Sequence, residues 1–150
     1  TPMFTHASWS DFRIIRAPLT GASLDDPTTT TKGRTIPYAV FATPELARIG
    51  LSEGEAREAG LDVRIAKVPT AAIPRAKTMR YAGEGFWKAV VDANTHQILG
   101  ATLIGPNVSE VITAVHVAMA GGLTYEQLRF LPSAHPTMGE GLQVLFDSLG

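Results

Sequence analysis

The residues of this sequence best suited to acid–base chemistry lie near its C-terminal end, in the segment Ser133-Ala134-His135-Pro136-Thr137-Met138-Gly139-Glu140. A neutral histidine near a carboxylate is the minimal pair for general acid–base catalysis near neutral pH, because the carboxylate orients the imidazole and stabilises its protonated form. His135 and Glu140 are therefore the candidate catalytic residues. A simpler interpretation stays open at this point: His135 is a turn residue, and Glu140 only caps a helix.

The residues around this pair predict a stiff loop that leads into a helix. Pro136 disfavours the helical conformation for His135, and an X-Pro bond adopts the cis form at a cost of only about 0.5–1 kcal/mol. Thr137 and Glu140 have the T-x-x-E spacing of a capping box, which predicts a helix that begins at about Met138. We therefore expect a cis His135–Pro136 peptide bond and an imidazole that points outward.

The composition excludes several classes of protein. The chain has 150 residues, of which 45% are hydrophobic and 18% charged, so it is long enough to bury a core. A net charge of −1 gives no basic surface for nucleic acid or for an anionic membrane. The absence of cysteine excludes disulfides, thiolate metal sites and a cysteine nucleophile within this sequence, and no His or acidic cluster has the spacing of a metal site.

The sequence contains no apolar run that predicts a membrane span or a secretory signal. The longest apolar-leaning run, Val111 to Leu123, is too short to cross a bilayer. The first residues, Thr1 to Phe4, include no initiator methionine and no basic region followed by an apolar stretch, so we expect a cut end of a longer protein. We expect a cytoplasmic location, with no nucleic-acid and no membrane partner.

The N-terminal part of the chain predicts one helix and a linker. Apolar residues at helical spacing predict a helix within residues 4–19 that ends before Pro18, with Ser8 or Ser10 available as its cap. Residues 20–34 are polar and contain four consecutive threonines, which is typical of a linker or an exposed hairpin. We therefore place the domain boundary in this stretch.

The rest of the chain predicts an antiparallel sheet and several helices. Hydrophobic periodicity and turn residues predict strands at 38–41, 46–50 and 62–68, a helix over 52–60, a loop over 70–85, a hairpin of 86–92 and 97–104, and helices over 108–123, 124–130 and 138–149. This order favours an α+β fold with two layers, in which helices pack mainly on one face of an antiparallel sheet.

An ordered series of motifs resembles the C-terminal interface, or dimerisation, domain of the FAD-dependent pyridine nucleotide-disulfide oxidoreductases. This family includes glutathione reductase, dihydrolipoamide dehydrogenase and mercuric reductase. The resemblance covers residues 36–150 and is carried by PYAVFATPELARIG over 37–50, GFWK over 85–88, ILGA over 98–101 and HPTxxE over 135–140. Residues 1–35 then resemble the tail of the preceding FAD domain together with a linker.

The resemblance implies a homodimer in which His135 reaches the redox-active dithiol of the partner subunit. His135 is then the acid–base group for the thiols, and Glu140 hydrogen-bonds the imidazole. FAD and NAD(P)H are implied for the full-length protein, bound by FAD and NAD(P)-binding domains upstream in the same chain. This fragment is expected to bind no cofactor and no metal, and to be colourless and inactive by itself. The substrate implied is a small disulfide or dithiol, because the mercuric reductases of the family lack this histidine.

A second interpretation is a purely structural dimerisation module of a flavoprotein reductase without dithiol chemistry. A C-x4-C motif in the upstream sequence would distinguish the two. Both interpretations predict self-association, through a surface formed by the terminal helices and one sheet face. We expect apolar residues such as Trp87, Met138 and Leu149 to lie in segments that a single small sheet does not cover.

Overall fold

The computed structural model describes residues 2–26 and 29–150, and the chain divides into two compact units between Ile36 and Pro37. The first unit contains helix α1 (Thr5–Leu19). The prediction that this helix ends before Pro18 is wrong, because Pro18 lies within its last turn, where the fixed φ of proline is compatible with helix. Its N-cap is Phe4, without a side-chain cap, so neither serine begins the helix.

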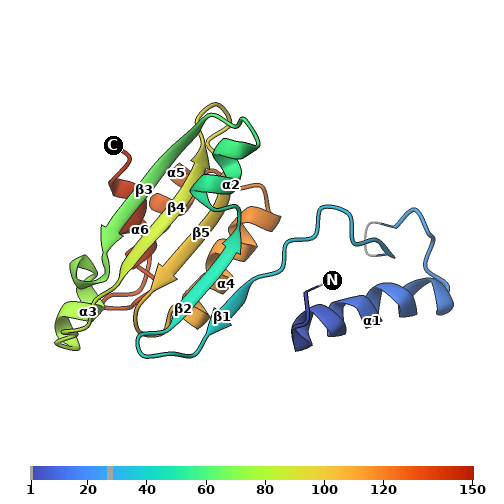
Figure 1. Cartoon of the computed structure of the whole chain (residues 1–150), viewed down its shortest axis with the longest axis horizontal. Helices are drawn as coiled ribbons and strands as arrows, with labels where there is room; N and C mark the ends of the chain where they lie inside the picture. The colour runs from blue at the N-terminus through green and yellow to red at the C-terminus, as the bar shows by residue number, and fades with distance from the viewer. Residues whose placement is uncertain (1, 27–28) are drawn as a thin grey trace. The chain divides into compact units, whose positions relative to one another are not determined.

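The second unit is built on a five-stranded antiparallel sheet with the strand order β1-β2-β5-β4-β3 (Figure 1). The strands are β1 (Tyr38–Val40), β2 (Leu46–Gly50), β3 (Val63–Pro69), β4 (Phe86–Asp92) and β5 (Ile98–Ile104). The hairpin of β4 and β5 occupies the middle of the sheet, as its long apolar strands predict.

Three helices cover one face of the sheet. Helix α4 (Val108–Ala120) packs against β2 and β5, α6 (Gly141–Asp147) packs against β3 and β4, and α5 (Tyr125–Arg129) packs against α6. Figure 1 shows these helices behind the strands, with the short helix α2 (Glu53–Glu58) in front. The predicted two-layer α+β fold is therefore confirmed. None of the helices among the described residues is long and apolar enough to cross a membrane.

Side chains of β4 alternate between these two faces. Trp87, Ala89 and Val91 belong to the buried core beneath the helices. Lys88 points to the opposite face, where its Nζ lies 2.5 Å from Glu53 Oε2 of α2. One small helix therefore partly covers the second face of the sheet through an ion pair, whereas the larger layer of helices covers the apolar face.

The core buries two residues that the sequence analysis expected to need a partner. Trp87 is 0% exposed and Met138 is 5% exposed, because α6 and the segment before it fold back over β4. Leu149 is half-buried. The expectation was therefore wrong for Trp87 and Met138, and these two side chains give no support to self-association.

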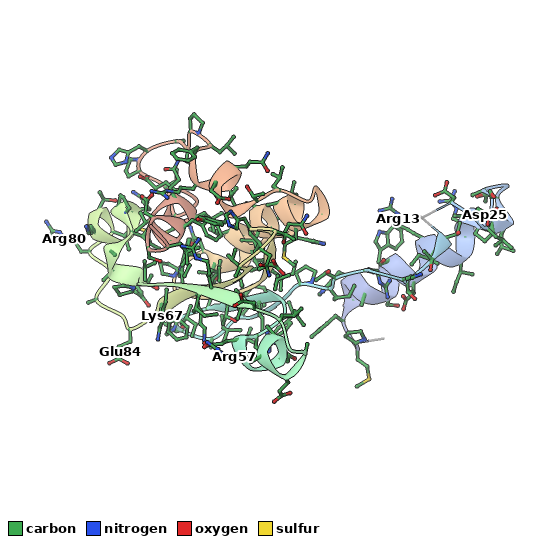
Figure 2. The ribbon with its side chains drawn as sticks, turned by 90° about the horizontal axis from the view of Figure 1, so that it is seen from above. Arg13, Asp25, Arg57, Lys67, Arg80 and Glu84 are labelled. Carbon is green, nitrogen blue, oxygen red and sulfur yellow. The ribbon has the colours of Figure 1, made fainter. Side chains whose placement is uncertain are left out.

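The segment after β3 is more regular than the predicted loop over residues 70–85. It forms a 3-10 turn, η2 (Thr70–Ala72), and a short helix, α3 (Pro74–Thr78). Pro74 occupies the first turn of α3, where a missing N–H group costs nothing, so it begins a helix rather than excluding one. Figure 2 shows Arg80 and Glu84, which follow this helix, at the surface of the unit, and both are exposed.

We predict that Gly100→Ala lowers the free energy of unfolding by about 1–3 kcal/mol, the usual cost of overpacking. Gly100 pairs with Gly50 across β5 and β2, and a Cβ atom there would collide with backbone atoms of Leu51 that cannot move independently. Urea denaturation would measure the change. The matched control is Gly54→Ala in α2, where the nearest neighbour of the new Cβ is the Ser52 hydroxyl at 3.9 Å. Equal losses in the two variants would contradict this account.

Candidate functional site

The structure brings the two candidate catalytic residues together. Nδ1 of His135 lies 3.0 Å from Oε1 of Glu140. The histidine side chain is 71% exposed, whereas that of Glu140 is only 12% exposed. The carboxylate therefore holds one ring nitrogen from the protein side, and Nε2 is the nitrogen available for proton exchange at the surface. The His135–Pro136 peptide bond is cis, as predicted.

Glu140 is itself fixed by a capping box with Thr137. Its Oε2 accepts a hydrogen bond from the Thr137 backbone N–H at 2.8 Å, and the Glu140 N–H donates to the Thr137 hydroxyl at 3.3 Å. That hydroxyl donates in turn to the carbonyl of Ala134 at 2.8 Å. The two carboxylate oxygens thus have separate tasks: Oε1 orients the imidazole, and Oε2 holds the turn that carries it.

The capping box closes a turn rather than opening the helix at Met138, so that predicted boundary is wrong. Helix α6 begins at Gly141, and the turn before it is closed by i→i−3 bonds, including Gly141 N–H to Met138 carbonyl at 2.9 Å and Gln143 N–H to Glu140 carbonyl at 3.0 Å. Glycine at 139 and 141 has low helix propensity, which favours this tighter first turn.

The local contacts also decide the charge on Glu140. The hydrogen bond from His135 lowers the pKa of the Glu140 carboxyl below its ordinary value, and the Thr137 N–H bond lowers it further, although burial acts in the opposite direction. Glu140 is therefore ionised at neutral pH. An ionised carboxylate at Nδ1 orients the ring and stabilises the imidazolium that forms when Nε2 accepts a proton.

His135 ends an exposed loop, residues 131–135, which we call the histidine loop. The beginning of this loop is attached to α6 by contacts that the sequence analysis missed. Residues 131–135 are all exposed, and Gln143 Nε2 donates a hydrogen bond to the Leu131 carbonyl, where this exposed run begins. Nearby, Arg129 Nε lies 2.6 Å from Asp147 Oδ1. Nothing in the sequence pattern indicates these contacts, because they depend on how α5 packs against α6.

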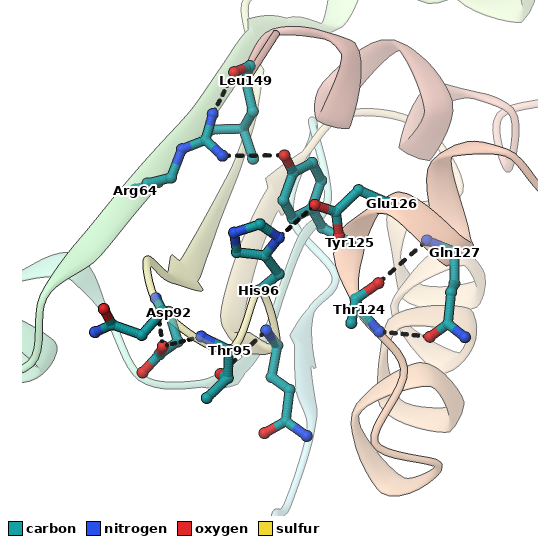
Figure 3. Close-up of polar contacts among 11 residues, drawn as sticks. Arg64, Asp92, Thr95, His96, Thr124, Tyr125, Glu126, Gln127 and Leu149 are labelled. Carbon is teal, nitrogen blue, oxygen red and sulfur yellow. Dashed lines mark hydrogen bonds and ion pairs between the residues drawn. The ribbon is translucent and has the colours of Figure 1, made fainter.

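A second histidine–carboxylate pair positions α5 (Figure 3). His96 Nδ1, in the turn between β4 and β5, lies 2.5 Å from Glu126 Oε1, and the His96 carbonyl accepts the Tyr125 N–H at 3.0 Å. Arg64 of β3 donates to the Tyr125 hydroxyl at 3.0 Å and to the Leu149 carbonyl. These contacts tie the hairpin and β3 to the helices, so we assign this pair a structural role.

Two features of the described residues bear on ligand binding. Among residues 2–26 and 29–150, no group of three His, Asp or Glu side chains could hold a metal ion. A hollow of about 650 Å³ lies along the first half of α1, lined by residues that include Trp9, Phe12 and Asp11 but no basic residue. We assign no ligand to this hollow.

Comparison with known proteins shows the family to which this chain belongs. The family model "Pyridine nucleotide-disulphide oxidoreductase, dimerisation domain" matches residues 36–145. The chain is 41% identical over 143 residues to the probable pyridine nucleotide-disulfide oxidoreductase RclA of Escherichia coli, covering 95% of this chain and 32% of that protein. It is 39% identical over 105 residues to dihydrolipoyl dehydrogenase of Bacillus subtilis, covering 70% of this chain and 22% of that protein.

The fold is also similar to a solved structure. The HOCl-induced flavoprotein disulfide reductase RclA from Escherichia coli matches with a TM-score of 0.88 and 40% identity, over 98% of this chain and 33% of that chain. The chain therefore spans about a third of the length of this relative.

We predict that the backbone amide resonance of Thr137 titrates with a midpoint below the ordinary pKa of a glutamate side chain. Its N–H group donates to Glu140, whose folded-state pKa is lowered. The stability that this carboxylate contributes is therefore present above its unfolded pKa and is lost as the pH falls through the lower folded value. NMR spectra recorded against pH would measure the midpoint.

The control for this titration is His135→Gln. That change removes the largest cause of the lowered pKa, so the midpoint should move upward towards the ordinary value. Identical midpoints in the two proteins would show that the histidine does not influence the carboxylate.

Proposed function

Because the chain belongs to the family of pyridine nucleotide-disulphide oxidoreductase dimerisation domains, we propose that it is the interface domain of a homodimeric FAD-dependent NAD(P)H:disulfide (dithiol) oxidoreductase. In this dimer, His135 and Glu140 of one subunit supply the acid–base pair for the redox-active dithiol of the other. The observation that carries the proposal is an exposed imidazole whose Nδ1 is held at 3.0 Å by a nearly buried carboxylate.

The composition and the exposure of the loop that carries His135 support a role for a partner subunit. The chain contains no cysteine, so the thiols that His135 serves must come from residues outside it. Where the histidine loop begins, Phe130 is 74% exposed and Leu131 is 57% exposed. Two neighbouring large apolar side chains next to an exposed polar loop are favourable contacts for a second subunit. We propose that this surface meets the partner subunit's dithiol region.

The proposed chemistry is thiol–disulfide exchange with a proton acceptor and donor. A thiolate of the reduced dithiol attacks one sulfur of the substrate disulfide, which forms a mixed disulfide and releases a thiolate that takes the proton from Nε2 of His135. The neutral ring then accepts the proton of the second thiol, whose thiolate attacks the mixed disulfide and expels the second substrate sulfur as a thiolate. This thiolate takes the proton back from Nε2, which leaves the ring neutral. The dithiol is oxidised to a disulfide, the substrate disulfide is reduced to two thiols, and Glu140 stabilises each imidazolium stage.

We propose that FAD and NAD(P)H bind to other domains of the full-length protein, where they supply the reducing electrons. Residues 1–35 are proposed to be the end of the FAD domain and a linker, and a cytoplasmic location is proposed for the whole protein. The isolated chain is proposed to be inactive, because acid–base residues without thiols have nothing to protonate.

We predict that His135→Gln in the full-length protein slows reoxidation by a disulfide substrate by about 10²- to 10⁴-fold, the usual contribution of a general acid–base group. Reduction of the protein by NAD(P)H should stay nearly unchanged, because hydride delivery needs no proton acceptor at the thiols. Glu140→Gln should slow reoxidation less, since the imidazole remains. Stopped-flow measurement of each half-reaction separates these effects.

The same measurement tests the structural alternative. If both half-reactions of the His135→Gln protein match those of the parent, the domain is a dimerisation module without dithiol chemistry. Equal slowing of both half-reactions would indicate a general structural defect instead.

We predict that activity returns when two inactive subunits combine in one dimer. Co-expression of a His135→Gln subunit with a subunit that lacks its dithiol creates one site with an intact dithiol from the first subunit and His135 from the second. Differently tagged subunits and tandem purification would isolate this heterodimer, and about half of the parental activity per dimer is expected. No recovered activity would show that His135 serves the dithiol of its own subunit.

A further inference from the structure

We propose that Gln143 on α6 is a positioning residue for His135, because it fixes the beginning of the loop whose end is fixed by Glu140. This inference rests on the proposed acid–base role of His135. The Gln143 side-chain amide donates to the Leu131 carbonyl, and the Glu140 carboxylate accepts from Nδ1 of His135 at 3.0 Å. One helix and the turn before it therefore hold both ends of the loop.

The loop needs such attachments because it has little packing of its own. All of residues 131–135 are exposed, so few apolar contacts define its conformation. A backbone hydrogen bond from a side chain at one end, and a carboxylate contact at the other, determine where the imidazole stands. With one attachment removed, the loop samples more conformations, and Nε2 spends less time in the position that the thiols require.

Helix α6 is a rigid support for these attachments. Leu142, Leu145 and Phe146 are buried in the core, at 4%, 0% and 0% exposure. The backbone of Gln143, which follows Leu142, is therefore fixed by residues on either side of it in the helix. By contrast, the nearby ion pair of Arg129 with Asp147 joins α5 to α6 and includes no residue of the loop 131–135. Gln143 is thus the stronger candidate.

The test uses the full-length protein and the isosteric change Gln143→Glu, which keeps the shape of the side chain but removes the N–H donor. Reoxidation by a disulfide substrate should slow roughly 10-fold, by analogy with the 10- to 100-fold losses found when a partner that orients a metal-ligating side chain is removed, while reduction by NAD(P)H stays unchanged. Gln143→Lys, which keeps a donor, should restore most of the rate. Gln143→Leu repeats the loss without a new charge.

The matched control is Gln97→Glu, which makes the same chemical change at an exposed position beside the β4–β5 turn. It should leave both half-reactions unchanged. The decisive variant is the double change His135→Gln with Gln143→Glu. If Gln143 acts through His135, the double variant is no slower than His135→Gln alone.

Two outcomes would overturn the inference while the proposed function stands: Gln143→Glu behaves like Gln97→Glu, or its effect multiplies that of His135→Gln. A third outcome, in which His135→Gln itself does not slow reoxidation, would overturn the proposed function and the positioning role together.

Discussion

The close approach of Gly141 to the indole of Trp87 is the constraint on which the site depends. A Cβ atom at position 141 would lie 2.6 Å from the Trp87 ring and 2.8 Å from Ile73, so only glycine allows the helix to start at this distance from the sheet. Gly141 follows Glu140 directly. The packing of a backbone against a buried ring on β4 thereby sets the position of the carboxylate, and through it the position of the imidazole.

In this site the Glu140 carboxylate is held against the folded domain, whereas the His135 ring is exposed. This arrangement suits the proposed chemistry. Glu140 lies against the folded domain, where its two oxygens are satisfied by separate donors. His135 stands at the surface, where its second nitrogen can exchange protons with groups that do not belong to this chain. A fully buried pair could not reach thiols of another subunit, and an unsupported surface histidine would not keep one orientation.

The same residue types have a different role on the other side of α5. His96 and Glu126 also form a close pair, but the histidine belongs to the β4–β5 turn and its backbone carbonyl accepts a bond from the first residue of α5. This pair, with Arg64 and Tyr125, joins separate strands and helices into one body. The exposed loop that carries His135 can therefore be short of internal contacts, because the elements on both sides of it are firmly attached.

Patterns within the sequence predicted the order of the strands and of the helices other than α3, the antiparallel sheet, the family and the proximity of His135 and Glu140. These features depend on local patterns: hydrophobic periodicity, turn residues, and a T-x-x-E spacing that acts over one turn. The folded chain was needed to show that Trp87 is buried, that α6 begins at Gly141, and that Gln143 donates to the Leu131 carbonyl. Each of these depends on contacts between residues distant in sequence, whose geometry follows from how the helices pack on the sheet.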